Sequence, residues 1–138
     1  YLGLCRLIGH QTGADYGYCA SRKLYHFGYK SEMKVPGTDY AMGTPHAMDI
    51  TFKFNNETPE NAPGFLSGEN PDRFTASHNM AELWANFART GKPFAIGVPE
   101  WPEYNLENRP SMRIDTKCEV MYNRFNNELD MWRLIGSL

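Results

Sequence analysis

His46 is the residue of this 138-residue chain with the most evident chemical use. It follows Pro45 at the end of a loop-type stretch, and a buried strand is expected before that stretch. An imidazole placed beyond the carboxyl end of a strand lies where α/β proteins bind ligands. Because histidine titrates near neutral pH, it can move a proton between a nucleophile and a leaving group. A single histidine, taken alone, is more often structural than catalytic.

The segments around His46 are expected to be extended or irregular. Residues 24–29 form a short, almost continuously apolar and aromatic run, which suits a central strand buried on both faces of a mainly parallel sheet. Residues 30–44 have the proline and glycine content of a loop. Residues 50–54 alternate in polarity, which predicts a strand or an extended segment, and residues 55–71 predict a surface excursion.

The second half predicts two helices and one more strand. The first helix has Ser77 as its N-cap and ends at Gly91, and its apolar stripe is Met80, Leu83, Trp84, Phe87 and Ala88. Residues 112–120 alternate as in a strand near a sheet edge. The C-terminal helix ends near Gly136. Trp84, Phe87 and Trp132 are predicted core residues, Trp101 a loop anchor, and residues 16–22 a short helix.

Composition excludes several classes of function. Net charge is −2 and no basic cluster is interleaved with aromatics, which argues against nucleic-acid binding. The apolar runs are too short for a membrane span. Cys5, Cys19 and Cys118 lack metal-type spacing and are predicted to be buried free thiols. A metal pair of His46 and Asp49 with His78 has no supporting ligand spacing, so neither a metal nor a cofactor is expected.

The segment around His46 resembles the histidine motif of type-B carboxylesterases and cholinesterases. The matching residues run Gly43-Thr44-Pro45-His46-Ala47-Met48-Asp49-Ile50-Thr51-Phe52-Lys53-Phe54. Residues 24–29, 83–93, 101–104 and 110–115 resemble further family elements in the same order. Leu129 stands where the cholinesterase branch has a cysteine, and Cys118 lies on the last strand, so the chain resembles bacterial carboxylesterases more closely.

The resemblance implies an α/β fold, as the C-terminal part of an α/β-hydrolase domain that is incomplete on its own. Residues 1–138 are expected to be one segment of a single domain whose upstream part is absent. The implied reaction is hydrolysis of a small-molecule ester through an acyl-enzyme, with His46 as general base. No Gly-x-Ser-x-Gly motif occurs in the chain, so the isolated chain is predicted to be inactive. The alternative is a non-catalytic, esterase-like binding or adhesion module.

Four further residues of the loop receive roles from the resemblance. Met42 and Met48 are candidates for the substrate pocket, although packing in the core is the plainer reading of a methionine. Gly43 and Asp49 are expected to be structural within the loop. Asp49 as the triad acid is the weaker alternative, because the family's acid precedes the histidine. The expected partners are the N-terminal portion of the same enzyme and, through the C-terminal helices, a second copy of it.

Overall fold

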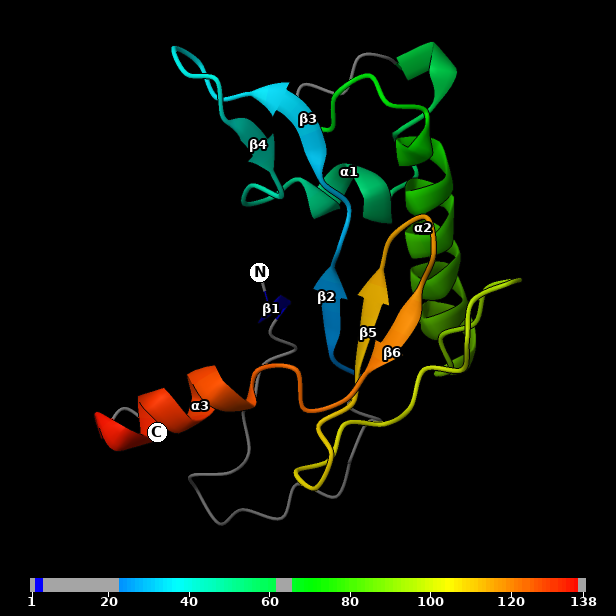
Figure 1. The fold of residues 1–138 in the computed structure, drawn as a ribbon. Coiled ribbons are helices and arrows are strands. Elements are labelled where there is room, and N and C mark those ends of the chain that lie inside the picture. The colour runs from blue at the N-terminus through cyan, green and yellow to red at the C-terminus, as the bar shows by residue number, and fades with distance from the viewer. Residues whose placement is uncertain (1, 4–22, 62–65, 137–138) are drawn as a thin grey trace.

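A computed structural model describes residues 2–3, 23–61 and 66–136 of the chain, and a small mixed sheet lies among them. The strands of this sheet, in spatial order, are β1 (Leu2–Gly3), β2 (Tyr25–Phe27), β5 (Ser111–Ile114) and β6 (Glu119–Met121). β2 and β5 are parallel, whereas β1 and β6 run antiparallel to their neighbours (Figure 1). The strand predicted in residues 24–29 is therefore confirmed over Tyr25–Phe27, and it lies inside the sheet. The sheet is mixed and not mainly parallel, and His26 is only half-buried, so burial on both faces is wrong for that residue.

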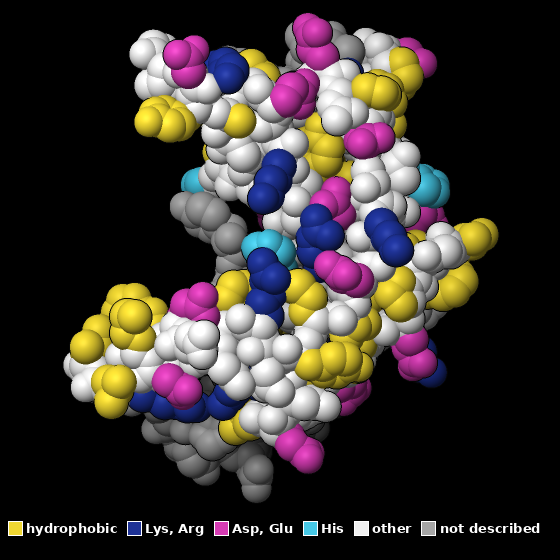
Figure 2. Space-filling view, in the orientation of Figure 1, with side chains coloured by type: hydrophobic (Ala, Val, Ile, Leu, Met, Phe, Trp, Pro, Cys, Tyr) yellow, Lys and Arg dark blue, Asp and Glu magenta, His cyan; other side chains and the backbone are white. Residues whose placement is uncertain are grey.

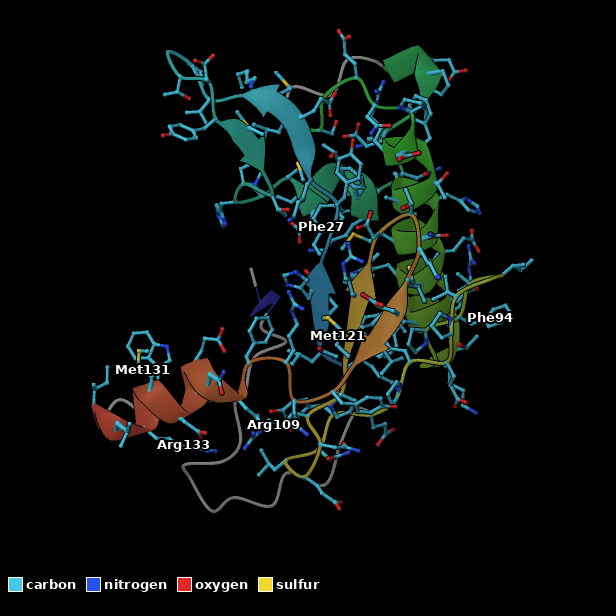
Figure 3. All side chains as sticks on the ribbon, in the orientation of Figure 1. Phe27, Phe94, Arg109, Met121, Met131 and Arg133 are labelled. Carbon is cyan, nitrogen blue, oxygen red and sulfur yellow. The ribbon has the colours of Figure 1, made fainter. Side chains whose placement is uncertain are left out.

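One face of this sheet packs against α2 (Asp72–Thr90), and α1 (Asp49–Lys53) packs in turn against α2 (Figure 1). The core contains alternate residues of β2 and β5 together with residues of both helices; its members include Tyr25, Phe27, Met112, Ile114, Phe52, Met80 and Leu83. The ring of Phe27 lies 4.7 Å from that of Phe52, and Figure 3 shows Phe27 between β2 and α1. The core thus joins β2 to the helix that follows His46.

The loop predicted for residues 30–44 is instead a two-stranded hairpin, β3 (Ser31–Lys34) with β4 (Ala41–Gly43). The Val35 N–H donates to the Tyr40 carbonyl at 2.9 Å and closes the turn, in which Gly37 has a φ of +77°. Proline and glycine were correctly linked to a turn, but the strands beside it are too short and too exposed to show an alternating pattern.

The extended segment predicted for residues 50–54 is wrong, because α1 occupies it. Asp49 and Lys53 form an i, i+4 ion pair of 2.6 Å, a spacing that places both side chains on one face of a helix. Phe52 is buried, whereas Ile50 and Phe54 are exposed. The alternation that predicted a strand therefore comes from three apolar residues, of which only Phe52 faces the core.

The long helix α2 begins earlier than predicted and ends where predicted. It starts at Asp72, with Pro71 as its N-cap, so the assignment of Ser77 as the cap is wrong. Ser77 is buried in mid-helix, where its Oγ donates to the Phe52 carbonyl at 3.4 Å. Gly91 ends the helix with a φ of +74°, and its N–H donates to the Phe87 carbonyl.

Two of the aromatic side chains predicted in the core behave differently. Trp84 is partly buried against the core, whereas Phe87 is exposed, so the assignment of Phe87 to the core is wrong.

Trp101 is confirmed as a loop anchor, because it is 4% exposed and its Nε1 donates to the Leu24 carbonyl at 3.0 Å. The surface excursion predicted for residues 55–71 contains the short 3-10 helix Pro59–Asn61 but also buried residues, among them Glu57 and Ser67.

The strand predicted over residues 112–120 is in fact two strands, β5 and β6, joined by a turn. The Asn79 side chain donates to the carbonyls of Asp115 and Thr116 at 2.9 and 3.2 Å, and so supports this turn from α2. The alternation of polar and apolar residues continues through the turn between β5 and β6, so the sequence pattern did not reveal that turn.

Cys118 is confirmed as a buried free thiol, whereas Cys5, Cys19 and residues 16–22 lie outside the described residues.

The C-terminal helix is confirmed as α3 (Asn126–Leu134), followed by Gly136 with a φ of +72°. None of its residues is buried, and Trp132 is 52% exposed, so its assignment to the core is wrong. Figure 1 shows α3 projecting away from the sheet, and Figure 2 shows hydrophobic side chains gathered at its far end. In the described part of the chain, no helix is long and apolar enough to cross a membrane.

Candidate active-site histidine loop

His46 lies in the turn between β4 and α1, and its side chain is exposed. The turn is shaped by two residues with left-handed backbone, Gly43 at a φ of +65° and Ala47 at +68°. A β-carbon is unfavourable in this region, so Ala47 requires support from its surroundings. The Met48 N–H donates to the Pro45 carbonyl at 3.4 Å, which closes the turn around His46.

Contacts on both sides of the turn connect it to β2 and the core. On the N-terminal side, the Thr44 hydroxyl donates to the Tyr29 carbonyl at 2.6 Å, just beyond β2. On the C-terminal side, Met48 is 1% exposed and belongs to the core. His46 is therefore an exposed imidazole on a short turn whose two neighbouring segments are fixed, which is the requirement for a side chain that must meet a partner group in a defined position.

Asp49 begins α1 and takes part in a polar cluster with β2. Its Oδ2 accepts a hydrogen bond of 2.9 Å from the Tyr25 hydroxyl and one of 2.6 Å from the Lys53 ammonium. Burial raises the pKa of the Asp49 carboxyl, but these two hydrogen bonds, the positive charge of Lys53 and a backbone hydrogen bond together leave the pKa below its ordinary value. Burial lowers the pKa of the Lys53 ammonium, but its interactions with Asp49 and Tyr25 leave that pKa above its ordinary value. Asp49 is ionised and bonded to other elements, in keeping with a structural role in the loop.

A second polar cluster lies deeper, between the segment after α1 and the start of α2. Ser67 donates to Glu57 Oε2 at 2.6 Å, and the Tyr29 hydroxyl donates to the Ser67 carbonyl at 3.0 Å. Arg73 Nε lies 3.5 Å from the same Glu57 oxygen without hydrogen-bond geometry, so this contact is an ion pair only. Glu57, Ser67 and Arg73 are each buried to 95% or more, and they fix the chain behind the histidine loop.

Glu32 attaches the β3–β4 hairpin to the segment that follows Ser67. Its Oε1 accepts from the N–H groups of Glu69 and Asn70 at 2.6 and 3.0 Å. Gly68 has a φ of +82°, and a β-carbon there would lie 2.5 Å from the Glu32 carboxylate, so glycine is required at this position. The hairpin that leads into the histidine turn is thus held against residues 68–70.

The structure places the predicted site residues on one segment but in different environments. Met42 and Gly43 are half-buried on β4, His46 is exposed, Met48 is in the core, and Asp49 is half-buried at the start of α1. Within the described residues, no group of three or more His, Cys, Asp or Glu side chains could hold a metal ion. Sequence reasoning missed Tyr25 and Lys53 as partners of Asp49; the i, i+4 spacing of Asp49 and Lys53 was the available indication.

Comparison with known proteins identifies the fold class first. A carboxylesterase of Geobacillus stearothermophilus superimposes with a TM-score of 0.55 at 28% identity, covering 78% of this chain and 21% of that one. A structure of a PNB esterase superimposes with a TM-score of 0.60 at 22% identity, covering 77% of this chain and 20% of the other, which bears on the fold alone. The described residues are part of an α/β-hydrolase fold.

The family follows from the sequence comparison. The chain matches the carboxylesterase family over residues 17–132 and belongs to it. Carboxylesterase 1C of Mus musculus is 31% identical over 132 residues, which are 96% of this chain and 22% of that protein. Liver carboxylesterase 1 of Mus musculus is 31% identical over 71 residues, 51% of this chain and 12% of that protein. The chain therefore spans less than a quarter of the length of these relatives.

Proposed function

We propose that the enzyme containing this chain hydrolyses carboxylic esters through an acyl-enzyme and that His46 is its general base. Membership of the carboxylesterase family supports the reaction class. The observation that carries the role of His46 is its position, exposed on a short turn whose flanks are fixed to β2 and to the core. In this proposal, the imidazole held there meets a nucleophile supplied by another part of the enzyme.

The proposed reaction has two steps in which His46 moves one proton each way. In the first step, the hydroxyl of a serine attacks the ester carbonyl, and His46 accepts the serine proton. His46 then returns that proton to the departing alcohol, leaving the acyl group on the serine. In the second step, a water molecule repeats the sequence and releases the acid. Because the chain has no Gly-x-Ser-x-Gly motif, the proposal assigns the serine to the remainder of the enzyme.

The remainder of the enzyme is also the proposed partner of this segment. The short sheet and the apolar residues of α3 are incompletely covered within the described residues; those of α3 and its end include Met131, Trp132, Leu134 and Ile135. Exposed apolar patches of this kind mark contact surfaces. We propose that the N-terminal portion of the same enzyme completes the domain and that the isolated chain does not hydrolyse esters.

The full-length enzyme carrying His46→Ala tests the assignment. Loss of the base should reduce kcat for a p-nitrophenyl ester by several orders of magnitude, on the order of 10⁴-fold or more, with the circular-dichroism spectrum unchanged. His78→Ala is the matched control, because His78 is an exposed histidine on α2 outside the turn. Near-normal turnover by His46→Ala would remove His46 from the mechanism.

A fluorophosphonate probe separates the enzyme from a non-catalytic relative. The probe phosphonylates a serine only when a base activates it, so the wild-type enzyme should be labelled and His46→Ala should not be. Mass spectrometry of the labelled peptide would also locate the serine. A wild-type protein that takes up no probe and hydrolyses no ester would instead be an esterase-like binding module.

A further inference from the structure

The Asp49 carboxylate is the centre of a polar and aromatic cluster that connects three elements behind the histidine turn. One of its oxygens accepts from the Tyr25 hydroxyl on β2 and from the Lys53 ammonium on α1. The Lys53 nitrogen also lies over two aromatic rings, 5.4 Å from the centre of Tyr25 and 5.5 Å from that of Trp84 on α2. A cation between two π faces and a carboxylate is held in a defined place.

The aromatic part of the cluster is itself fixed to the rest of the fold. The Tyr25 and Trp84 rings meet edge to face at 4.9 Å, and the Trp84 ring centre lies 6.0 Å from that of Trp101. Trp101 is tied to the strand through its hydrogen bond to the Leu24 carbonyl. The Lys23 ammonium in turn donates to the Trp101 carbonyl at 2.6 Å. The carboxylate of Asp49 is thus attached to a rigid aromatic support.

Helix α1 connects Asp49 to the turn that contains His46. The helix has only five residues, and its N-cap residue Met48 makes no side-chain capping bond. A helix this short has little intrinsic stability, so its position depends on side-chain anchors. Those anchors are Phe52 and the N-cap residue Met48 in the core, and Asp49 at the first position. The Ile50 N–H donates to the Ala47 carbonyl at 3.1 Å, which continues the helix directly into the turn that contains His46.

We propose that Tyr25 and Lys53 are positioning residues, which hold Asp49 and, through it, the turn that presents His46 to the nucleophile. This proposal rests on the proposed function of His46. Neither residue touches the reacting atoms in this scheme. They act on the orientation of the imidazole, and a small misplacement of a catalytic group lowers the rate of the chemical step more than it weakens substrate binding.

Steady-state kinetics of the full-length enzyme with a p-nitrophenyl ester test the proposal. Lys53→Met removes the ammonium and should lower kcat by about 10- to 100-fold with KM little changed. Lys53→Arg keeps a cation within reach of Asp49 and should restore most of kcat. Tyr25→Phe keeps the ring and removes only the hydroxyl, and it should lower kcat by about tenfold. Lys117→Met makes the same change at an exposed lysine in the turn between β5 and β6 and is the matched control, with kcat unchanged.

A double-variant comparison and an active-site titration separate positioning from general damage. Asp49→Asn and Lys53→Met act through one contact, so the double variant should be no slower than the slower single variant, whereas independent damage would multiply. Titration with a fluorophosphonate should show the same number of reactive sites as in the wild type, with slower labelling.

If Lys53→Met and Tyr25→Phe both keep wild-type kcat while His46→Ala is inactive, the positioning proposal is wrong and the proposed function stands. If Lys53→Arg is as slow as Lys53→Met, or the loss of kcat equals a loss of titrated sites, the proposal is also wrong.

Discussion

Helices α2 and α3 have similar apolar patterns in the sequence but different surroundings in the structure. α2 buries Ala76, Met80 and Leu83 against the sheet, whereas no residue of α3 is buried. Their ion pairs differ in the same way. The side chains of Arg73 and Glu57 are each 4% exposed, whereas those of Arg133 and Asp130 are more than half exposed. A periodic stripe therefore predicts a helix, and only the neighbouring elements determine whether that helix is covered.

The largest expected effect is the loss of the buried ion pair at the start of α2. Arg73→Met leaves the buried Glu57 carboxylate with Ser67 as its hydrogen-bond donor but without the cation, and should reduce the free energy of unfolding by about 3–5 kcal/mol. Arg133→Met on α3 should change it by about 0–1 kcal/mol. Urea denaturation of the full-length protein measures both values. Equal losses from the two variants would remove the contrast between the helices.

A smaller effect is expected from the apolar residues of α3 when the 138-residue chain is produced alone. We expect the chain to self-associate through this helix, because Met131, Trp132 and Ile135 are exposed on it and at its end. Trp132→Ser should weaken the association by about tenfold or more, as expected for removal of one large apolar contact. Sedimentation velocity over a concentration series measures this. A stable, monodisperse wild-type monomer would contradict the prediction.

The smallest expected effect comes from the hydroxyl of the buried residue Tyr29. Burial raises the pKa of Tyr29 to about 12, against an ordinary value of about 10 in the unfolded chain. The stabilising contribution of the neutral hydroxyl is therefore fully present below pH 10 and is lost as the pH rises from about 10 through 12. Tyr29→Phe should cost about 1 kcal/mol at neutral pH, through the lost bond to the Ser67 carbonyl, and should flatten this alkaline decline. Urea denaturation at several alkaline pH values checks the slope; an unchanged slope would exclude Tyr29 as its source.

Much of the fold could be predicted from local sequence, and the errors have a common cause. The strand at residues 24–29, the end of α2 at Gly91 and the anchoring role of Trp101 depend on composition and turn chemistry within a few residues. The start of α2 was misplaced because Ser77, a favourable cap by type, instead bonds to Phe52 across the core. The exposure of Trp132 could not be predicted either, since nothing within α3 determines what lies beside it.

The sequence predicted which residues belong to the candidate site but not the contacts that they make. His46, Gly43 and Asp49 were chosen from one continuous motif, and the structure places them on one turn and its flanks. The partners of Asp49 were missed because Tyr25 lies 24 residues away in the sequence and Lys53 was assigned to an extended segment. A contact between distant residues depends on tertiary packing, which one sequence does not contain in any local pattern.

The parallel pairing of β2 with β5 has a consequence for the order of folding. β2 precedes the histidine turn and β5 follows α2, and the Trp101 side chain meets the Leu24 carbonyl 77 residues earlier in the chain. Contacts of such high sequence separation close a long loop and form slowly. During synthesis, the histidine turn would leave the ribosome well before the strand that completes its support. The turn would then acquire its final geometry late, at the moment when β5 pairs with β2.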